Sequence, residues 1–158
     1  MVKANNPKGG GSDPFQLDRF MNAQERIYHT VLEELRNGQK ESHWMWFIFP
    51  QIDGLAHSTT SKYYAIKGIE EAQCYLNNHI LGKRLFECAE TVLAVEGRSI
   101  SQIFGYPDDL KLKSSMTLFA YVTDWNPGSV FVRVLDKYFN GERDGKTLEI
   151  LKKLKDIV

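Results

Sequence analysis

The sequence predicts an all-α fold, a single compact domain of about six or seven helices. Apolar residues recur at three- and four-residue spacing along most of the chain, which is the pattern of helices that bury one face. Short polar turns rich in Gly, Asn and Pro separate these stretches. The 158 residues suffice for one domain, and 42% hydrophobic with 25% charged residues is an ordinary globular composition.

The domain is expected to occupy residues 13–158. Residues 1–12 contain no apolar signal core and end in "GGGS", from Gly9 to Ser12. A Gly/Ser-rich stretch of this kind behaves as a flexible linker. We therefore interpret residues 1–12 as a flexible leader outside the fold.

The first helix is predicted to start at Asp13-Pro14 and to run for about six turns. Asp caps free backbone donors, and Pro is tolerated at the first helical position. An apolar stripe then continues from Leu17 to Leu35, and Asn37-Gly38 ends it.

Three further helices are predicted in the middle of the chain. One covers residues 62–76, with Gly68 as a candidate break, and the next covers residues 81–95. Ser99 is placed to cap a short helix that runs through Phe104.

The C-terminal third is also predicted to be helical. Asp108 or Asp109 is expected to cap a helix over residues 110–122, although the β-forming residues 117–122 leave a strand as the alternative. A turn at residues 126–128 precedes a helix over residues 130–138. The last helix is expected to open at Asp144.

The stretch "SHWMWFIFPQ", from Ser42 to Gln51, is the least regular part of the sequence. Residues 44–49 have a strand-like composition, and the alternative to a helix is a strand paired with residues 117–122. A lone pair of strands is only marginally stable unless it packs on helices. We predict instead a short buried helix that ends at Pro50.

Charge and composition exclude several classes of function. The 20 basic and 20 acidic residues cancel, so we expect neither general nucleic-acid binding nor membrane-surface binding. No apolar run approaches the about 18 residues of a membrane span. Cys74 and Cys88 are interpreted as buried reduced thiols, which favours a cytoplasmic protein.

No metal site and no cofactor are predicted. The histidines are scattered and form no HExxH motif or Cys/His pairing, and no phosphate-loop or dinucleotide-binding glycine pattern occurs. The four histidines are His29, His43, His57 and His79.

The candidate site residues come from two separate regions. His43 is the candidate acid/base, because its ordinary pKa is about 6.5, although a core-edge histidine bonded to backbone is the alternative. Trp44 has a ring for stacking, but core packing is the commoner use. The other candidate ligand-binding residues are Gln51, Ser58 and Ser61 from the first region and Lys111, Lys113, Ser114 and Ser115 from the second. Helix capping and an exposed amphipathic face are their simpler explanations.

Three segments in this order and spacing resemble a bacterial family of unknown function whose members often carry the label calpastatin. They are "DPFQLDRFMNAQ", "SHWMWFIFPQIDGL" and "IFGYPDDLKLKSSMTLFA", supported by "YAIKGIEEAQCYL" and "LGKRL", and the likeness covers about residues 13–151. The calpastatin label does not fit, since nothing here resembles a disordered protease inhibitor.

The resemblance implies a mostly helical, cytoplasmic, single-domain protein, and it implies no activity or catalytic residue. The family usually has a glycine where Ala56 stands. This departure weakens the expectation that the backbone of the loop at residues 54–56 cradles a ligand.

Two classes of function remain open at this point. The leading hypothesis is that a His/Trp/Lys/Ser pocket binds or processes a small anionic or nucleotide-like ligand. The alternative is a protein-interaction module without catalytic activity. The sequence decides neither whether the protein is an enzyme nor which oligomeric state it adopts.

Overall fold

The computed structural model describes residues 12–157, so the predicted leader, apart from Ser12, lies outside the described residues. The described part is all-helical, as predicted, and holds ten helices rather than six or seven. They are α1 (Asp18–Gln24), α2 (Tyr28–Arg36), α3 (Met45–Ile48), α4 (Thr59–Tyr64), α5 (Ile69–Asn77), α6 (Leu81–Ala94), α7 (Ile100–Phe104), α8 (Asp108–Val122), α9 (Val130–Phe139) and α10 (Gly145–Ile157).

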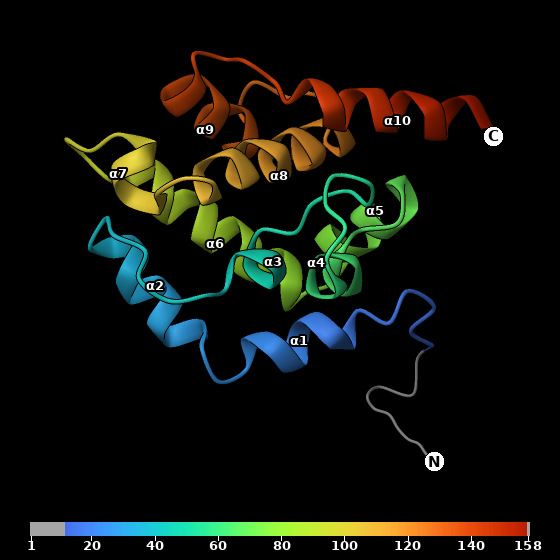
Figure 1. Cartoon of the computed structure of the whole chain (residues 1–158), viewed down its shortest axis with the longest axis horizontal. Helices are drawn as coiled ribbons and strands as arrows, with labels where there is room; N and C mark the ends of the chain where they lie inside the picture. Colours follow the sequence, from blue (N-terminus) through green and yellow to red (C-terminus); the bar gives the residue numbers. More distant parts are fainter. Residues whose placement is uncertain (1–11, 158) are drawn as a thin grey trace.

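The helices form one body with α6 and α8 in contact with most of the others (Figure 1). Helix α6 packs on α2, α5 and α9, and α8 packs on α5, α7, α9 and α10. In the view of Figure 1, α1 and α2 lie along one side, α8, α9 and α10 lie along the other, and α3, α4, α5 and α6 lie between them. A single cluster of buried apolar side chains runs through all of these parts.

The seven regular helices predicted become ten because two of them are each divided and the short helix of the aromatic run is added. The predicted helix from Asp13 to Leu35 bends between Gln24 and Tyr28, so that α1 packs on α3 while α2 packs on α6. The side chain of Gln24 is buried at this bend and donates to the carbonyl oxygen of Phe47 at 2.8 Å. The Asp13 carboxylate accepts from the backbone N–H groups of Leu17 and of Asp18, the first residue of α1, so it caps the turn that leads into this helix.

The predicted helix over residues 62–76 is divided by an extended segment at Ala65 to Gly68. The N–H of Ile66 donates to the Gln51 carbonyl at 2.8 Å, and the N–H of Asp53 donates to the Ile66 carbonyl at 2.8 Å. These bonds form an isolated parallel bridge between Ile52 and Ile66. The bridge holds the end of α4 beside the chain that leaves the aromatic run.

The helix starts follow the expected rules in most places. Ser99 caps α7 as part of a capping box, and Asp144 accepts a hydrogen bond from the N–H of Thr147 at the start of α10. The helix α8 was predicted correctly, but its cap was not: Asp108 and Asp109 lie inside its first turn, and Pro107 precedes it without a side-chain cap. There the two carboxylates favour the positive end of the helix dipole.

The aromatic run forms the short buried helix α3, and residues 117–122 belong to α8, so neither alternative strand forms. Trp44, Ile48 and Phe49 are buried, and the Trp44 ring contacts those of Phe49 and Phe104. Cys88 is buried and Cys74 is half-buried, and both are free thiols. Over residues 12–157, no helix is both long and apolar enough to cross a membrane.

Candidate functional site

The aromatic run and the start of α8, which the sequence analysis singled out separately, are in contact. The Lys111 ammonium lies 4.2 Å from the centre of the Trp46 ring, and the Lys40 ammonium lies 4.9 Å from that of Trp44. Asp108 joins the two lysines, at 2.8 Å from Lys40 and 3.1 Å from Lys111. Each lysine therefore contacts an indole face and the same carboxylate.

This cluster fixes the charge state of Asp108. Burial alone would raise the pKa of Asp108, but hydrogen bonds and attraction from Lys40 and Lys111 outweigh burial and lower the pKa below its usual value. The carboxylate is therefore ionised at neutral pH and holds α8 against the chain that leads into α3.

A small pocket opens beside Trp46, where α3 ends and α4 begins. Its volume is about 10 Å³, close to the room that one water molecule needs. We call it the Trp46–Gln51 pocket; its lining consists of Trp46, Gln51, Ile52, Gly54, Leu55, Ala56, Ser61, Tyr64 and Ala65. Burial raises the pKa of the Tyr64 phenol, so this hydroxyl stays protonated.

The side chain of Gln51 is the unusual feature of this pocket. Gln51 is 8% exposed, and its Nε2 atom is buried without a hydrogen-bond partner in the described structure. An unpaired buried donor costs about 1–3 kcal/mol, and native structures contain few of them. The backbone bridge at Ile66 fixes the Gln51 main chain, so this lining residue is held in place beside the pocket.

The serines of the neighbouring loop are engaged with one another. Ser58 Oγ caps α4 by accepting from the N–H of Ser61 at 3.1 Å, and Ser61 Oγ donates to the Ser58 carbonyl at 2.9 Å. Ser61 lines the pocket and keeps a lone pair free to accept, whereas Ser58 is exposed and does not line it. Helix capping therefore accounts for Ser58.

His43 and Trp44, at the entry to the aromatic run, point to different surroundings. His43 is exposed and lines neither of the two pockets beside α4. Trp44 is 1% exposed and donates its indole N–H to Glu34 at 2.8 Å. The ring of Trp44 is thus enclosed by protein.

Glu34 holds the start of the aromatic run in place through hydrogen bonds. Its carboxylate also accepts from the N–H groups of Glu41 and Ser42 and from the Ser42 hydroxyl. Burial would raise the pKa of Glu34, but these hydrogen bonds overcome burial and lower the pKa to about 2. The polar end of the aromatic run is therefore tied to α2.

The remaining candidate residues on α8 make contacts that differ from those of Lys111. Lys113 pairs with Glu142 at 3.2 Å, and the Ser114 hydroxyl donates to the Leu110 carbonyl. Ser115 is fully buried, and its Oγ has no hydrogen-bond partner among residues 12–157, but it does not line the Trp46–Gln51 pocket. Among the second group of candidates, Lys111 is the one shown in contact with a pocket residue.

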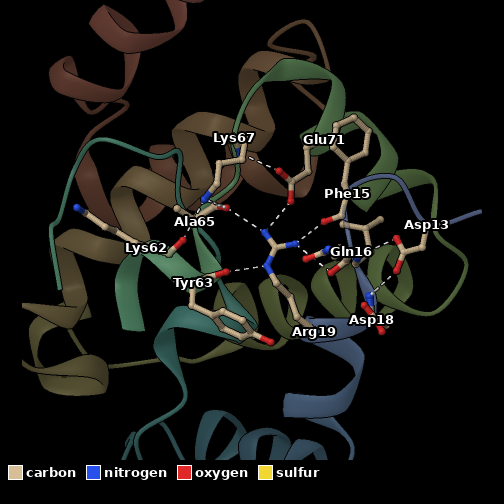
Figure 2. Close-up of polar contacts among 11 residues, drawn as sticks. Asp13, Phe15, Gln16, Asp18, Arg19, Lys62, Tyr63, Ala65, Lys67 and Glu71 are labelled. Carbon is tan, nitrogen blue, oxygen red and sulfur yellow. Dashed lines mark hydrogen bonds and ion pairs between the residues drawn. The ribbon is translucent and has the colours of Figure 1, made fainter. Parts of the chain in front are cut away.

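A second hollow lies on another face of α4, and the sequence analysis did not predict it. It contains Arg19, whose guanidinium bonds to the carbonyls of Tyr63 and Ala65 and forms an ion pair with Glu71 at 2.7 Å (Figure 2). The one signal in the sequence was the charge of Arg19 between the apolar residues Leu17 and Phe20, where a helix buries one face.

Within residues 12–157, no group of three or more His, Cys, Asp or Glu side chains is placed to hold a metal ion. The polar side chains that line the pocket include the amide of Gln51 and the hydroxyls of Ser61 and Tyr64, and the Lys111 ammonium contacts the lining residue Trp46. The donors of these groups suit a hydrogen-bond acceptor.

Comparison with known proteins shows that the chain is similar to proteins of unknown function. A family model described as "Protein of unknown function (DUF1810)" matches residues 14–151. The crystal structure of the conserved hypothetical protein Rv1873 from Mycobacterium tuberculosis is similar, with 54% identity and a TM-score of 0.86 over 89% of this chain and 99% of that one. No protein with a curated description matches.

Proposed function

We propose that the Trp46–Gln51 pocket binds a small anionic ligand through an acceptor oxygen of that ligand. The chain belongs to the DUF1810 family of proteins of unknown function, and the proposal starts from that premise. The ligand group is a carboxylate or a phosphate, including the phosphate end of a nucleotide-like molecule. The proposal is one of binding, and it assigns no catalytic step.

The observation that carries the proposal is the unpaired Nε2 of Gln51 in a pocket. An amide donor that is kept buried and unpaired lowers stability, and a ligand acceptor that pairs with it removes this cost. Polar groups that lower stability in this way are typical of binding sites. The Ser61 hydroxyl beside it offers an acceptor to a protonated or hydroxylated ligand.

Charge and size narrow the ligand. The Lys111 ammonium lies on the face of the lining residue Trp46, and a positive charge there favours an anion. A volume of about 10 Å³ admits one oxygen atom of the ligand but not a base or a ring. The body of the ligand would therefore rest at the mouth of the pocket.

A thermal-shift screen with small carboxylates, phosphorylated metabolites and nucleotides tests the proposal. A ligand at a hundred times its dissociation constant adds about 2.7 kcal/mol to the free energy of unfolding. Gln51→Met keeps the length of the side chain but removes the amide, so it should abolish the shift caused by a compound that binds at this pocket. Ser115→Ala, which removes the other unpaired buried group, and Lys153→Ala on α10 should both retain it.

Two results would contradict binding at this pocket: no shift with any compound, or shifts that all persist in Gln51→Met. The interaction module would then be the better explanation. It is favoured by one observation, the exposure of Tyr106 at 81% and of Leu110 at 49% near the start of α8.

A further inference from the structure

We propose a second binding site, the groove beside Arg19, for a small organic anion in which a carboxylate or phosphate is attached to an apolar body. The groove has a volume of about 350 Å³, within the range of small-molecule sites. It lies between the turn that leads into α1 and the end of α4. It shares no lining residue with the Trp46–Gln51 pocket, so it does not depend on the proposed function.

The walls of this groove are held in place before any ligand arrives. The guanidinium of Arg19 has five N–H donors, and the five acceptors around it are the carbonyls of Phe15, Gln16, Tyr63 and Ala65 and the carboxylate of Glu71 (Figure 2). Arg19 is therefore a clamp between the two walls rather than a ligand-binding group. A site whose walls are already fixed loses little entropy on binding.

The lining carries net positive charge. Arg19 and Glu71 neutralise each other, and Glu71 also accepts from the N–H of Lys67. The Lys67 ammonium donates to the carbonyls of Lys62 and Ala65, and within residues 12–157 neither Lys62 nor Lys67 forms an ion pair. Two cations without carboxylate partners at one groove favour an anion.

The acids nearby do not cancel this charge at the lining. Asp13 and Asp18 are not part of the lining, and Figure 2 shows them on the side of Arg19 away from Lys62. The Asp13 carboxylate already accepts from the backbone N–H groups of Leu17 and Asp18.

The rest of the groove suits an apolar or aromatic group. Pro14 and Phe15 line one wall, and the Tyr63 ring lines the other at 57% exposure. Tyr63 packs edge-to-face on Tyr64 with ring centres 4.8 Å apart, so the exposed ring is held as a stacking surface. An anion near the lysines and an aromatic body beside Tyr63 are thus both accommodated.

Titration of the isotope-labelled full chain with phenyl phosphate, benzoate and phenol, followed by nuclear magnetic resonance, tests this site. Both anionic probes should shift the backbone amide signals of Tyr63 and Lys67 saturably, and phenol should not. Lys62→Glu should lower the affinity for both anions at least about tenfold, the size expected for losing a charged contact. Lys153→Glu makes the same change of net charge on α10 and should leave the affinity unchanged.

The proposal is overturned if neither anion gives saturable shifts, if phenol shifts the same signals equally, or if Lys62→Glu and Lys153→Glu weaken binding alike. Phenyl phosphate and benzoate differ in charge and geometry, so the stronger of the two identifies the source of the anion as phosphate or carboxylate. Gln51→Met should leave these titrations unchanged, which separates this site from the Trp46–Gln51 pocket.

Discussion

Arg19 and Gln51 are both buried polar side chains beside α4, but their hydrogen bonding differs completely. Every N–H of the Arg19 guanidinium has an acceptor, whereas Nε2 of Gln51 has none in the described structure. They border different faces of the helix: Ser61 and Tyr64 line the pocket of Gln51, and Lys62 and Tyr63 line the groove of Arg19.

This difference indicates that Arg19 has a structural role, whereas Gln51 is a candidate for binding. A buried charge with all its partners present fixes two segments relative to each other, and its loss is costly. A buried amide with no partner contributes nothing to holding the fold and lowers stability. Figure 2 illustrates the first kind of group, and the same reasoning places Glu34, with its four hydrogen bonds, beside Arg19.

Arg19→Met should give the largest effect. It leaves the buried Glu71 carboxylate without its cation and removes a donor from several carbonyls, so the free energy of unfolding should fall by about 3–5 kcal/mol. Urea unfolding measures this, and Arg26→Met, at an exposed position, is the matched control. Adding Glu71→Met should restore part of the loss, because the unpaired charge is then gone. A cost below about 1 kcal/mol for Arg19→Met would show that the clamp is not structural.

Glu34 is a second buried charge with all its partners present, here an anion, and its contribution to stability depends on pH. Its pKa is lowered from 4.5 to about 2 in the folded state, so its contribution is present above pH 4.5 and is lost as the pH falls toward 2. We expect about 2 kcal/mol of stability to disappear in this window, allowing for solvent near the carboxylate. Urea unfolding as a function of pH measures the loss.

Glu34→Gln should lower stability at pH 7 and flatten the profile between pH 4.5 and 2. Its amide group would face backbone donors where the carboxylate accepts. Glu33→Gln on the exposed face of α2 keeps the wild-type profile if the reasoning is right. An unchanged profile in Glu34→Gln would mean that another carboxylate sets the acid sensitivity.

The elements of the fold could be predicted from sequence because they rest on local patterns. The periods of α6 and α9, the Ser99 cap and the Asp144 cap all depend on neighbours in the chain. The bend after Gln24 and the break at residues 65–68 could not be predicted, because each is imposed by tertiary contacts. Packing decides such boundaries more than propensity does.

The candidate site was predictable only in part for the same reason. An aromatic run and a basic segment have recognisable residue types, and the structure brings Trp46 and Lys111 from them into contact. For Arg19 the one signal was its charge between apolar residues, and its partners could not be predicted because two of its acceptors are backbone carbonyls 44 and 46 residues away. Whether a buried polar group is paired, as Arg19 is and Gln51 is not, depends on the folded surroundings.

Gln51→Met and Ser115→Ala should give the smallest effects, and of opposite sign to those at Arg19 and Glu34. Each removes one buried unpaired polar atom at nearly constant volume, so stability should rise by about 1 kcal/mol, with Ser115→Ala also gaining helix propensity. Thermal unfolding without ligand measures both. Because Ser115 lies outside the pocket, only Gln51→Met should combine higher stability with loss of a ligand-induced shift. Destabilisation by Gln51→Met would instead mean that the amide is paired in solution and belongs with Arg19 among the structural groups.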